Sequence, residues 1–174
     1  AGMLLPALAR AREEARKAVC KGNLKQIGLS CIMYSNDYDE SWPRNSTTST
    51  VDGTVSLSLL FDNYLSSEQV LKCPSTDTKP EVSGTTLTTS YLYDGAKNPR
   101  ANPMTAMASD DLANGTGTGY ADESTTTTGR LINHENGINV LYYDGHVEWQ
   151  NSWLNFYTGA TDNILTSALL DEFS

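Results

Sequence analysis

The chain has 174 residues, of which 39% are hydrophobic and 19% are charged, and its formal net charge at pH 7 is -9. This length and composition suit one soluble domain with a sizeable core, and they argue against disorder and against a membrane-spanning bundle. The acidic balance argues against a nucleic-acid partner, because binding to a phosphate backbone requires clustered excess cations. Residues 1–30 differ from the rest, because they hold six of the twelve basic residues and only two acidic ones. A basic N-terminal segment is therefore joined to an acidic body.

Residues 8–38 predict a long helix, because they lack proline and consist largely of Ala, Arg, Glu, Lys, Leu and Gln. Partway along, apolar residues begin to recur at steps of four and three, which places them on one stripe facing a core. The stripe comprises Cys20, Leu24, Ile27, Cys31, Tyr34 and Tyr38. No such stripe exists between Arg10 and Lys17. We therefore expect residues 1–19 to protrude as a helix segment and residues 20–174 to form a single globular head.

Downstream of this helix, short ordered elements alternate with polar loops. Residues 55–65 carry apolar side chains at helical spacing and predict a second, short helix. Residues 75–90 and 113–129 are rich in Ser, Thr and Gly, which predicts long loops or irregular edge strands. Residues 90–93 and 104–109 are candidates for further strands.

The clearest strand signal lies near the end of the sequence, where residues 138–143 and 146–149 flank Asp144-Gly145. A two-residue Asp-Gly loop between strand-forming runs predicts a β-hairpin, and a type I′ turn would use the positive φ that both residues tolerate. Together the elements predict an α+β fold. In it, a long N-terminal helix packs on a small antiparallel sheet with long Ser/Thr/Gly-rich loops.

Three separated motifs resemble those of bacterial prepilin-like proteins. The first is CKGNLKQIGL at residues 20–29, preceded by MLLPAL at residues 3–8, and the second is Leu71-Lys72-Cys73-Pro74. The third is His134, nine intervening residues and Asp144-Gly145. Its spacing is similar to that of the H-x9-DG prepilin-type processing-associated group, which is related to the pseudopilins of type II secretion.

The resemblance implies a structural protein and not an enzyme. It implies a pilin-like subunit of a pseudopilin or type IV pilus-like filament, anchored in the inner membrane with a periplasmic or extracellular head. Its partners would be other pilin-like subunits, the membrane, and the prepilin peptidase that acts on the precursor. In this interpretation the apolar residues 1–9 are the surviving end of the hydrophobic helix. The basic run 10–25 then meets anionic headgroups or a neighbouring subunit, unless it is simply a solvated helix face.

The three cysteines are too few for a disulfide framework, and the absence of a CxxC pair argues against structural zinc. Cys20 and Cys31 lie about 16 Å apart along a helix and cannot bridge each other, whereas Cys73 could reach either. Because Cys20 belongs to the prepilin-like stretch, a Cys20–Cys73 disulfide is the preferred pair if the head lies in an oxidising compartment. Otherwise all three are small buried apolar groups.

Two alternatives to a purely structural role are a catalytic site and a calcium site. Cys73, His134 and Asp144 include the residue types of a nucleophile, a base and an orienting acid, but the turn already explains Asp144. Hard oxygen ligands for calcium are a second option. The candidates are His134, His146, Asp110, Asp111, Asp122 and Glu123. We expect no cofactor, and we expect His134 to hydrogen-bond a carboxylate or a backbone carbonyl as a structural residue.

The alternative function is a surface-displayed carbohydrate-binding module or adhesin. It rests on the Thr-rich loops and on Trp42, Trp149 and Trp153, because aromatic faces pack well against sugars. A Cys/His hydrolase is a more remote alternative.

Overall fold

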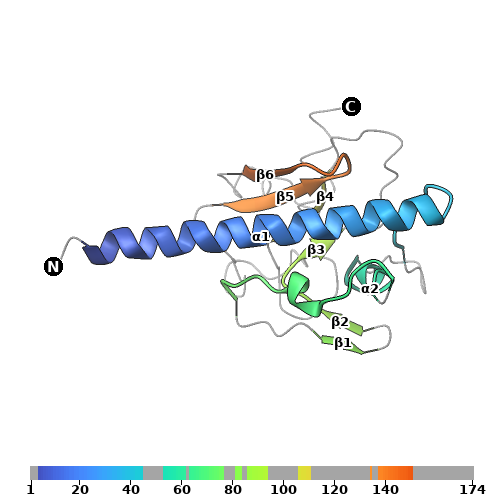
Figure 1. Cartoon of the computed structure of the whole chain (residues 1–174), viewed down its shortest axis with the longest axis horizontal. Helices are drawn as coiled ribbons and strands as arrows, with labels where there is room; N and C mark the ends of the chain where they lie inside the picture. Colours follow the sequence, from blue (N-terminus) through green and yellow to red (C-terminus); the bar gives the residue numbers. More distant parts are fainter. Residues whose placement is uncertain are drawn as a thin grey trace, which may run out of the picture.

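The computed structural model describes residues 4–44, 53–61, 63–76, 81–83, 86–93, 106–110, 134 and 137–150. Its helices are α1 (Leu4–Asp37), α2 (Gly53–Ser58) and the 3-10 helix η1 (Glu68–Leu71). Its strands are β1 (Glu81–Ser83), β2 (Thr86–Thr88), β3 (Leu92–Tyr93), β4 (Ala106–Ser109), β5 (Ile138–Tyr142) and β6 (Val147–Gln150). α1 runs across the molecule between the β5–β6 hairpin and the layer formed by α2 with β1 and β2 (Figure 1). The predicted α+β fold is confirmed.

The main sheet has four antiparallel strands in the order β3-β4-β5-β6, and β1 pairs with β2 in a separate ribbon. Every residue of β4 and β5 is buried, whereas in β6 only Val147 is. Both faces of the two central strands are therefore covered, and their side chains are apolar or aromatic except for the buried Ser109 and Asn139. The expected strands at residues 90–93 and 104–109 correspond to β3 and β4.

The predicted stripe on α1 is the face that enters the core. Cys20, Leu24, Ile27 and Cys31 are fully buried, and Tyr34 packs against the same cluster as a half-buried residue. The stripe ends there, because Tyr38 is 50% exposed and stacks on Tyr34 with the ring centroids 4.2 Å apart. Four turns of one helix thus supply much of the core.

The β5–β6 hairpin is confirmed, but its turn is not the predicted type I′. The N–H of Gly145 donates to Tyr142 O at 2.9 Å, and the N–H of Tyr142 donates to His146 O at 3.0 Å, which closes a three-residue loop. Within that loop only Gly145 has a positive φ, of 84°. The loop is therefore a type I turn followed by a glycine bulge. Asp144 avoids the strained conformation and instead accepts the N–H of His146 at 2.9 Å.

The second helix is shorter than the predicted 55–65, because α2 ends at Ser58. The chain then tightens through hydrogen bonds between residues three apart, such as Leu60 N–H to Leu57 O at 3.1 Å. Leu57, Leu60 and Leu65 are nevertheless all buried. The apolar spacing in residues 55–65 correctly indicates burial. A hydrogen-bonded turn after α2 gives the same spacing as a helix, so the pattern alone does not show where the helix ends.

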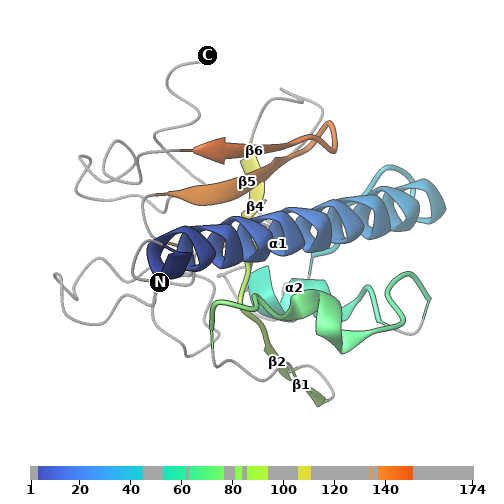
Figure 2. The ribbon, with the colours of Figure 1, turned by 60° about the vertical axis from the view of Figure 1, so that its left-hand side comes forward.

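The first turns of α1 extend beyond the other labelled elements in Figure 1, and Figure 2 shows the helix from nearer its N-terminal end, between the β5–β6 hairpin and α2. Residues 5–12 are all exposed. Pro6 lies in the first turn, where the missing N–H would have no helical partner in any case. Among the described residues, contacts of α1 with the head begin at Glu13, inside the segment 1–19 that we expected to protrude. Among the described helices, none combines the length and apolarity needed to cross a membrane.

Candidate functional site

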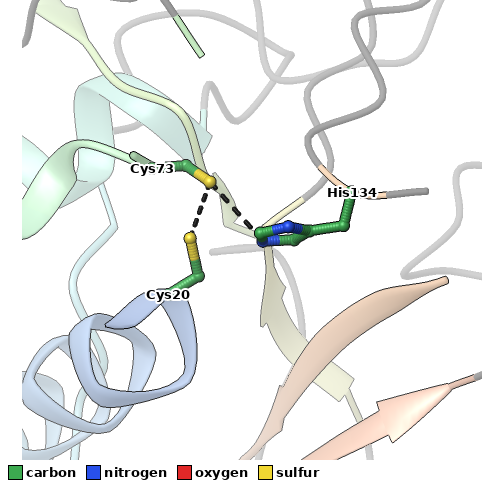
Figure 3. Close-up of side chains that lie close together, drawn as sticks. All are labelled: Cys20, Cys73 and His134. Atoms are coloured by element: carbon green, nitrogen blue, oxygen red, sulfur yellow. Dashed lines mark hydrogen bonds between the residues drawn. The ribbon is translucent and has the colours of Figure 1, made fainter. Parts of the chain in front are cut away.

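Three segments that are distant in sequence bring Cys20, Cys73 and His134 together (Figure 3). Cys20 comes from α1, Cys73 follows η1, and His134 precedes β5. Cys20 Sγ lies 2.6 Å from Cys73 Sγ, and His134 Nε2 lies 3.6 Å from Cys73 Sγ. The two cysteines are fully buried free thiols, and His134 is 1% exposed. The site is therefore an enclosed cluster at the junction of helix and head.

Local sequence explains how Cys73 reaches this position. Ser67 caps η1 by accepting the N–H of Gln69 at 3.3 Å, and Lys72 leaves the helix in an extended conformation. The next turn has Pro74 at its second position, where the fixed φ of proline is favoured. It is closed by the N–H of Thr76, which donates to Cys73 O at 3.1 Å. A short helix and a proline turn thus present the Cys73 sulfur to α1.

His134 lies between two carboxylates. Its Nδ1 is 2.8 Å from Glu13 Oε1 on α1 and 3.3 Å from Ser75 Oγ. Its Nε2 is 3.3 Å from Asp110 Oδ2, in addition to its contact with Cys73. Both ring nitrogens therefore face acceptors, which is the environment of a doubly protonated imidazolium.

The Asp110 carboxylate is fixed by Asn139 at the start of β5. Asn139 donates its backbone N–H to Asp110 Oδ1 at 2.8 Å and its side-chain amide to Asp110 Oδ2 at 2.6 Å. The same amide lies 3.2 Å from Lys17 O on α1. One asparagine thereby joins the end of β4, the start of β5 and the helix around the site.

These contacts shift the ionisation of the cluster. Burial opposes a charged ring, but the hydrogen bonds with Asp110, Cys73 and Glu13 outweigh it and raise the pKa of His134 to about 10. The hydrogen bond from Cys20, with help from His134 and against burial, lowers the pKa of Cys73 to about 6. The same contact and burial raise the pKa of Cys20 far above its usual range. Near neutral pH the arrangement is a Cys73 thiolate beside a Cys20 thiol and an imidazolium.

The same three side chains offer metal ligand atoms, all within 4.8 Å of one another. Two thiolates and an imidazole are ligands that zinc prefers. Because these ligands come from three separate segments, the absence of a CxxC pair does not exclude metal binding. An imidazolium, however, has no lone pair for a metal, so metal would have to displace the proton.

The structure separates the two ends of the H-x9-DG spacing. His134 precedes β5 and joins the cysteine cluster, whereas Asp144 and Gly145 follow β5 in the hairpin turn. Asp144 Oδ1 is 2.5 Å from His146 Nδ1 instead. The considered trio of Cys73, His134 and Asp144 is therefore not assembled, and Glu13 and Asp110 are the carboxylates beside the histidine.

The other candidates are not gathered into a site by the described residues. Asp110 is buried in the cysteine cluster, and His146 lies in the hairpin turn, so these two calcium candidates are apart. Asp111, Asp122, Glu123 and Trp153 lie outside the described residues.

The two described tryptophans, Trp42 and Trp149, are half-buried in the head. Trp42 packs edge-on against Tyr143 with the ring centroids 4.8 Å apart, and Lys17 Nζ lies 4.4 Å from the ring centroid of Trp149. Both indoles contact protein groups and keep part of their surface exposed, so the sugar-binding alternative stays a prediction.

Sequence reasoning missed Glu13, Asp110 and Asn139 as partners of the site. Glu13 had a usable signal, because it lies seven residues before Cys20 and so extends the buried stripe by two turns. No sequence signal identifies Asp110 and Asn139, because the contact between them depends on the pairing of β4 with β5.

Comparison with known proteins gives one partial match. A family model described as a protein of unknown function (DUF1559) matches residues 9–61. No curated protein and no solved structure matches the chain. The matched segment contains Glu13 and Cys20 and ends before Cys73 and His134, so it covers the helix side of the cluster alone.

Proposed function

We propose that this protein is a structural subunit of a pilin-like assembly, in which α1 is the packing element and carries the head. The prepilin-like motifs and the DUF1559 match over residues 9–61 are compatible with this role. The proposal includes membrane anchoring through a hydrophobic helix continuous with α1, and partners that are other pilin-like subunits.

The observation that carries the proposal is an apolar face of α1 that the head leaves uncovered. Its large side chains are Leu5, Leu8, Val19, Leu29 and Met33, which are 44% to 71% exposed. At about 100° per residue they fall within about 120° of one another on the helix. Arg12 and Gln26, both exposed, lie within the same arc, so the face is apolar over most of its length but not all of it. An aligned apolar face of this kind marks an interaction surface.

A third face of α1 carries positive charge. Arg10, Lys21 and Lys25 are exposed and lie within about 60° of one another, with Glu14 between them, and Lys25 is about 40° from Leu29 at the edge of the apolar face. The rest of the protein is strongly acidic. A second subunit could therefore cover the apolar face while its acidic head lies near the basic one. Such packing of unlike surfaces produces an open filament and not a closed ring.

The burial of the cysteine cluster argues against a hydrolase. A thiolate, an imidazolium and a carboxylate are present, but Cys73 is fully buried and hydrogen-bonded to Cys20. A nucleophile of that kind must be reachable by its substrate. A structural subunit needs no such access.

The proposal is tested by photo-crosslinking in cells that express the complete gene product. A photoreactive residue at Val19 or Leu29, on the apolar face, should give adducts with another pilin-like subunit in the membrane fraction. The same residue at Glu14, which is exposed and lies about 140° around the helix from Val19, should give fewer adducts. Recovery of the complete gene product in the soluble cytoplasmic fraction would disprove the anchored role.

A second variant tests the face without a probe. Val19→Asp should abolish assembly but leave the melting temperature of the isolated protein nearly unchanged, because the side chain is 51% exposed. Normal assembly by this variant would exclude the apolar face as the contact.

A further inference from the structure

We propose that Cys20 and Cys73 form a reversible dithiol–disulfide couple that fastens α1 to the head, and that His134 is a positioning residue that holds Cys73 as the reacting thiolate. This inference goes beyond the assembly role and does not depend on it. The couple is an internal redox site.

The positions of the two sulfurs carry the inference. Cys20 Sγ and Cys73 Sγ are 2.6 Å apart and fully buried, although the residues are 53 positions apart in the chain. Among the residues of α1 whose burial is described, Cys20 is the first that is fully buried, and it lies seven residues after Glu13, which already contacts His134. A bond here would therefore fix the first turns of the packed part of the helix to the head.

His134 contacts the sulfur that would react. Its Nε2 is 3.6 Å from Cys73 Sγ, and Glu13 and Asp110 hold the ring in its charged form. A positive group beside a cysteine stabilises the thiolate, which is the species that attacks disulfides and also the better leaving group. In this role His134 favours the reduced pair and makes the bond reversible.

The third cysteine supplies the contrast. Cys31 is also fully buried on α1, and burial raises the pKa of its thiol, which a hydrogen bond with Tyr93 only partly offsets. It therefore stays protonated, as a buried structural cysteine does. Cys31 is the natural control for the pair.

A metal centre fits these atoms less well than a redox pair. Two sulfurs bound to one zinc ion stand about 3.7 Å apart, since each Zn–S bond is about 2.3 Å long in a tetrahedral site. The observed separation of the two sulfurs is 2.6 Å. The charged histidine also opposes a cation. Metal binding is accordingly an outcome that the experiment must exclude.

The oxidant required is a low-molecular-weight disulfide such as oxidised glutathione, which reaches the buried sulfurs only when the structure around the cluster opens locally. The Cys73 thiolate attacks one sulfur of the oxidant, which forms a mixed disulfide and expels one thiolate. The Cys20 thiol then loses its proton to that thiolate and attacks the Cys73 sulfur, which forms the Cys20–Cys73 bond and expels the second thiolate. One thiol and one thiolate of the protein are oxidised, and one disulfide is reduced to a thiol and a thiolate.

The site can be tested by its redox equilibrium, which does not depend on how fast a buried sulfur is reached. The protein is equilibrated with mixtures of reduced and oxidised glutathione, quenched with acid, denatured, alkylated and weighed by mass spectrometry. Wild type should form one intramolecular disulfide, and Cys31→Ser should match it. Cys20→Ser and Cys73→Ser should form none. A Cys20–Cys73 pair that stays reduced in excess oxidised glutathione would overturn the proposal.

The role of His134 is tested by the pH profile of that equilibrium. Among the described residues, the ionisable groups that act on the pair are Tyr91, Asp110 and His134, and Glu13 acts on His134. In wild type the disulfide should become less favoured by up to about tenfold per pH unit above pH 6, because the reduced form gains the Cys73 thiolate. His134→Asn should move the onset of this dependence to higher pH and favour the disulfide by up to about tenfold at pH 7. An unchanged profile would remove His134 from the proposal.

Two controls keep the result interpretable. Glu13→Gln leaves the histidine in place but weakens its charge, so it should shift the same profile in the same direction by a smaller factor if His134→Asn does not fold. Addition of zinc to the reduced protein should not block oxidation. Binding of one zinc ion per chain, with loss of disulfide formation, would make the cluster a metal site and overturn the redox assignment.

Discussion

The two halves of α1 are built from similar residues but have different surroundings. Residues 5–12 are exposed, and the first turns of α1 project beyond the other labelled elements (Figure 1), whereas Cys20, Leu24, Ile27 and Cys31 are fully buried in the head. Helix propensity is high in both halves. Packing against the head offsets the unfavourable free energy of nucleating the helix in the packed half. The projecting half only extends that helix, and extension costs much less free energy than nucleation. One continuous helix can therefore contribute core residues with its packed half and an exposed surface with its projecting half.

The largest expected effect comes from removing a side chain of the packed half. Leu24→Ala should lower the free energy of unfolding by about 2–5 kcal/mol, because the leucine is fully buried and the truncation leaves a cavity. Leu8→Ala, in the projecting half, should change it by less than about 0.5 kcal/mol, since Leu8 is 50% exposed. Urea denaturation of the two variants measures the difference. Equal losses would mean that the projecting turns are packed in solution.

The division of the helix was largely predictable from the sequence. The spacing of Cys20, Leu24, Ile27 and Cys31 identifies the buried face, because apolar periodicity and burial have the same cause. The hairpin was also predictable from Asp144-Gly145, although its turn type was not. A glycine with positive φ can close either a two-residue or a three-residue loop, and strand register decides between them.

The candidate site was predictable only in part. Cys20 and Cys73 were paired through the resemblance of their flanking residues, and the disulfide itself stays a prediction. The position of His134 beside them and the roles of Glu13 and Asp110 depend on how four separate segments pack. No local pattern encodes contacts across more than a hundred residues, such as that between Glu13 and His134.

The boundary between the two halves can be probed through Glu13, the first residue of α1 that contacts the head. Glu13→Gln should destabilise the protein by about 1–2 kcal/mol near pH 6, because the ion pairs of Glu13 with His134 and Arg16 are replaced by weaker contacts with a neutral amide. Glu14→Gln is the matched control, with an effect below about 0.5 kcal/mol, since its carboxylate is exposed and pairs only with Lys17 among the described residues.

The pH dependence of that loss follows from the two partners. The folded-state pKa of His134 is raised to about 10, so its contribution is complete below its ordinary value near 6.5 and declines as the pH rises toward 10. Hydrogen bonds with His134 and Arg16 outweigh burial and lower the pKa of Glu13, so its contribution declines as the pH falls below about 4.5. The difference between Glu13→Gln and wild type should therefore be greatest between these limits. A difference that does not vary with pH would show that the contact is not ionic.

The smallest effect, and the finest probe of the packed half, comes from its two glycines. A Cβ at Gly22 would meet nothing within 4 Å, whereas a Cβ at Gly28 would lie 2.9 Å from Cδ1 and 3.2 Å from Cδ2 of Leu141 on β5. Alanine improves helix propensity over glycine by about 1 kcal/mol at either position. Gly22→Ala should therefore stabilise the protein by about 0.5–1 kcal/mol. Gly28→Ala should lose that gain, because the fully buried Leu141 must shift to admit the methyl group.

Thermal unfolding measured on both variants under the same conditions gives the comparison directly. The melting temperature should rise for Gly22→Ala and should stay level or fall for Gly28→Ala. Because helix propensity contributes equally to both substitutions, their difference reports the closeness of α1 to β5 alone. An equal rise in both variants would mean that the helix does not lie against β5 at Gly28, and that the packed half of α1 approaches the sheet less closely than the structure places it.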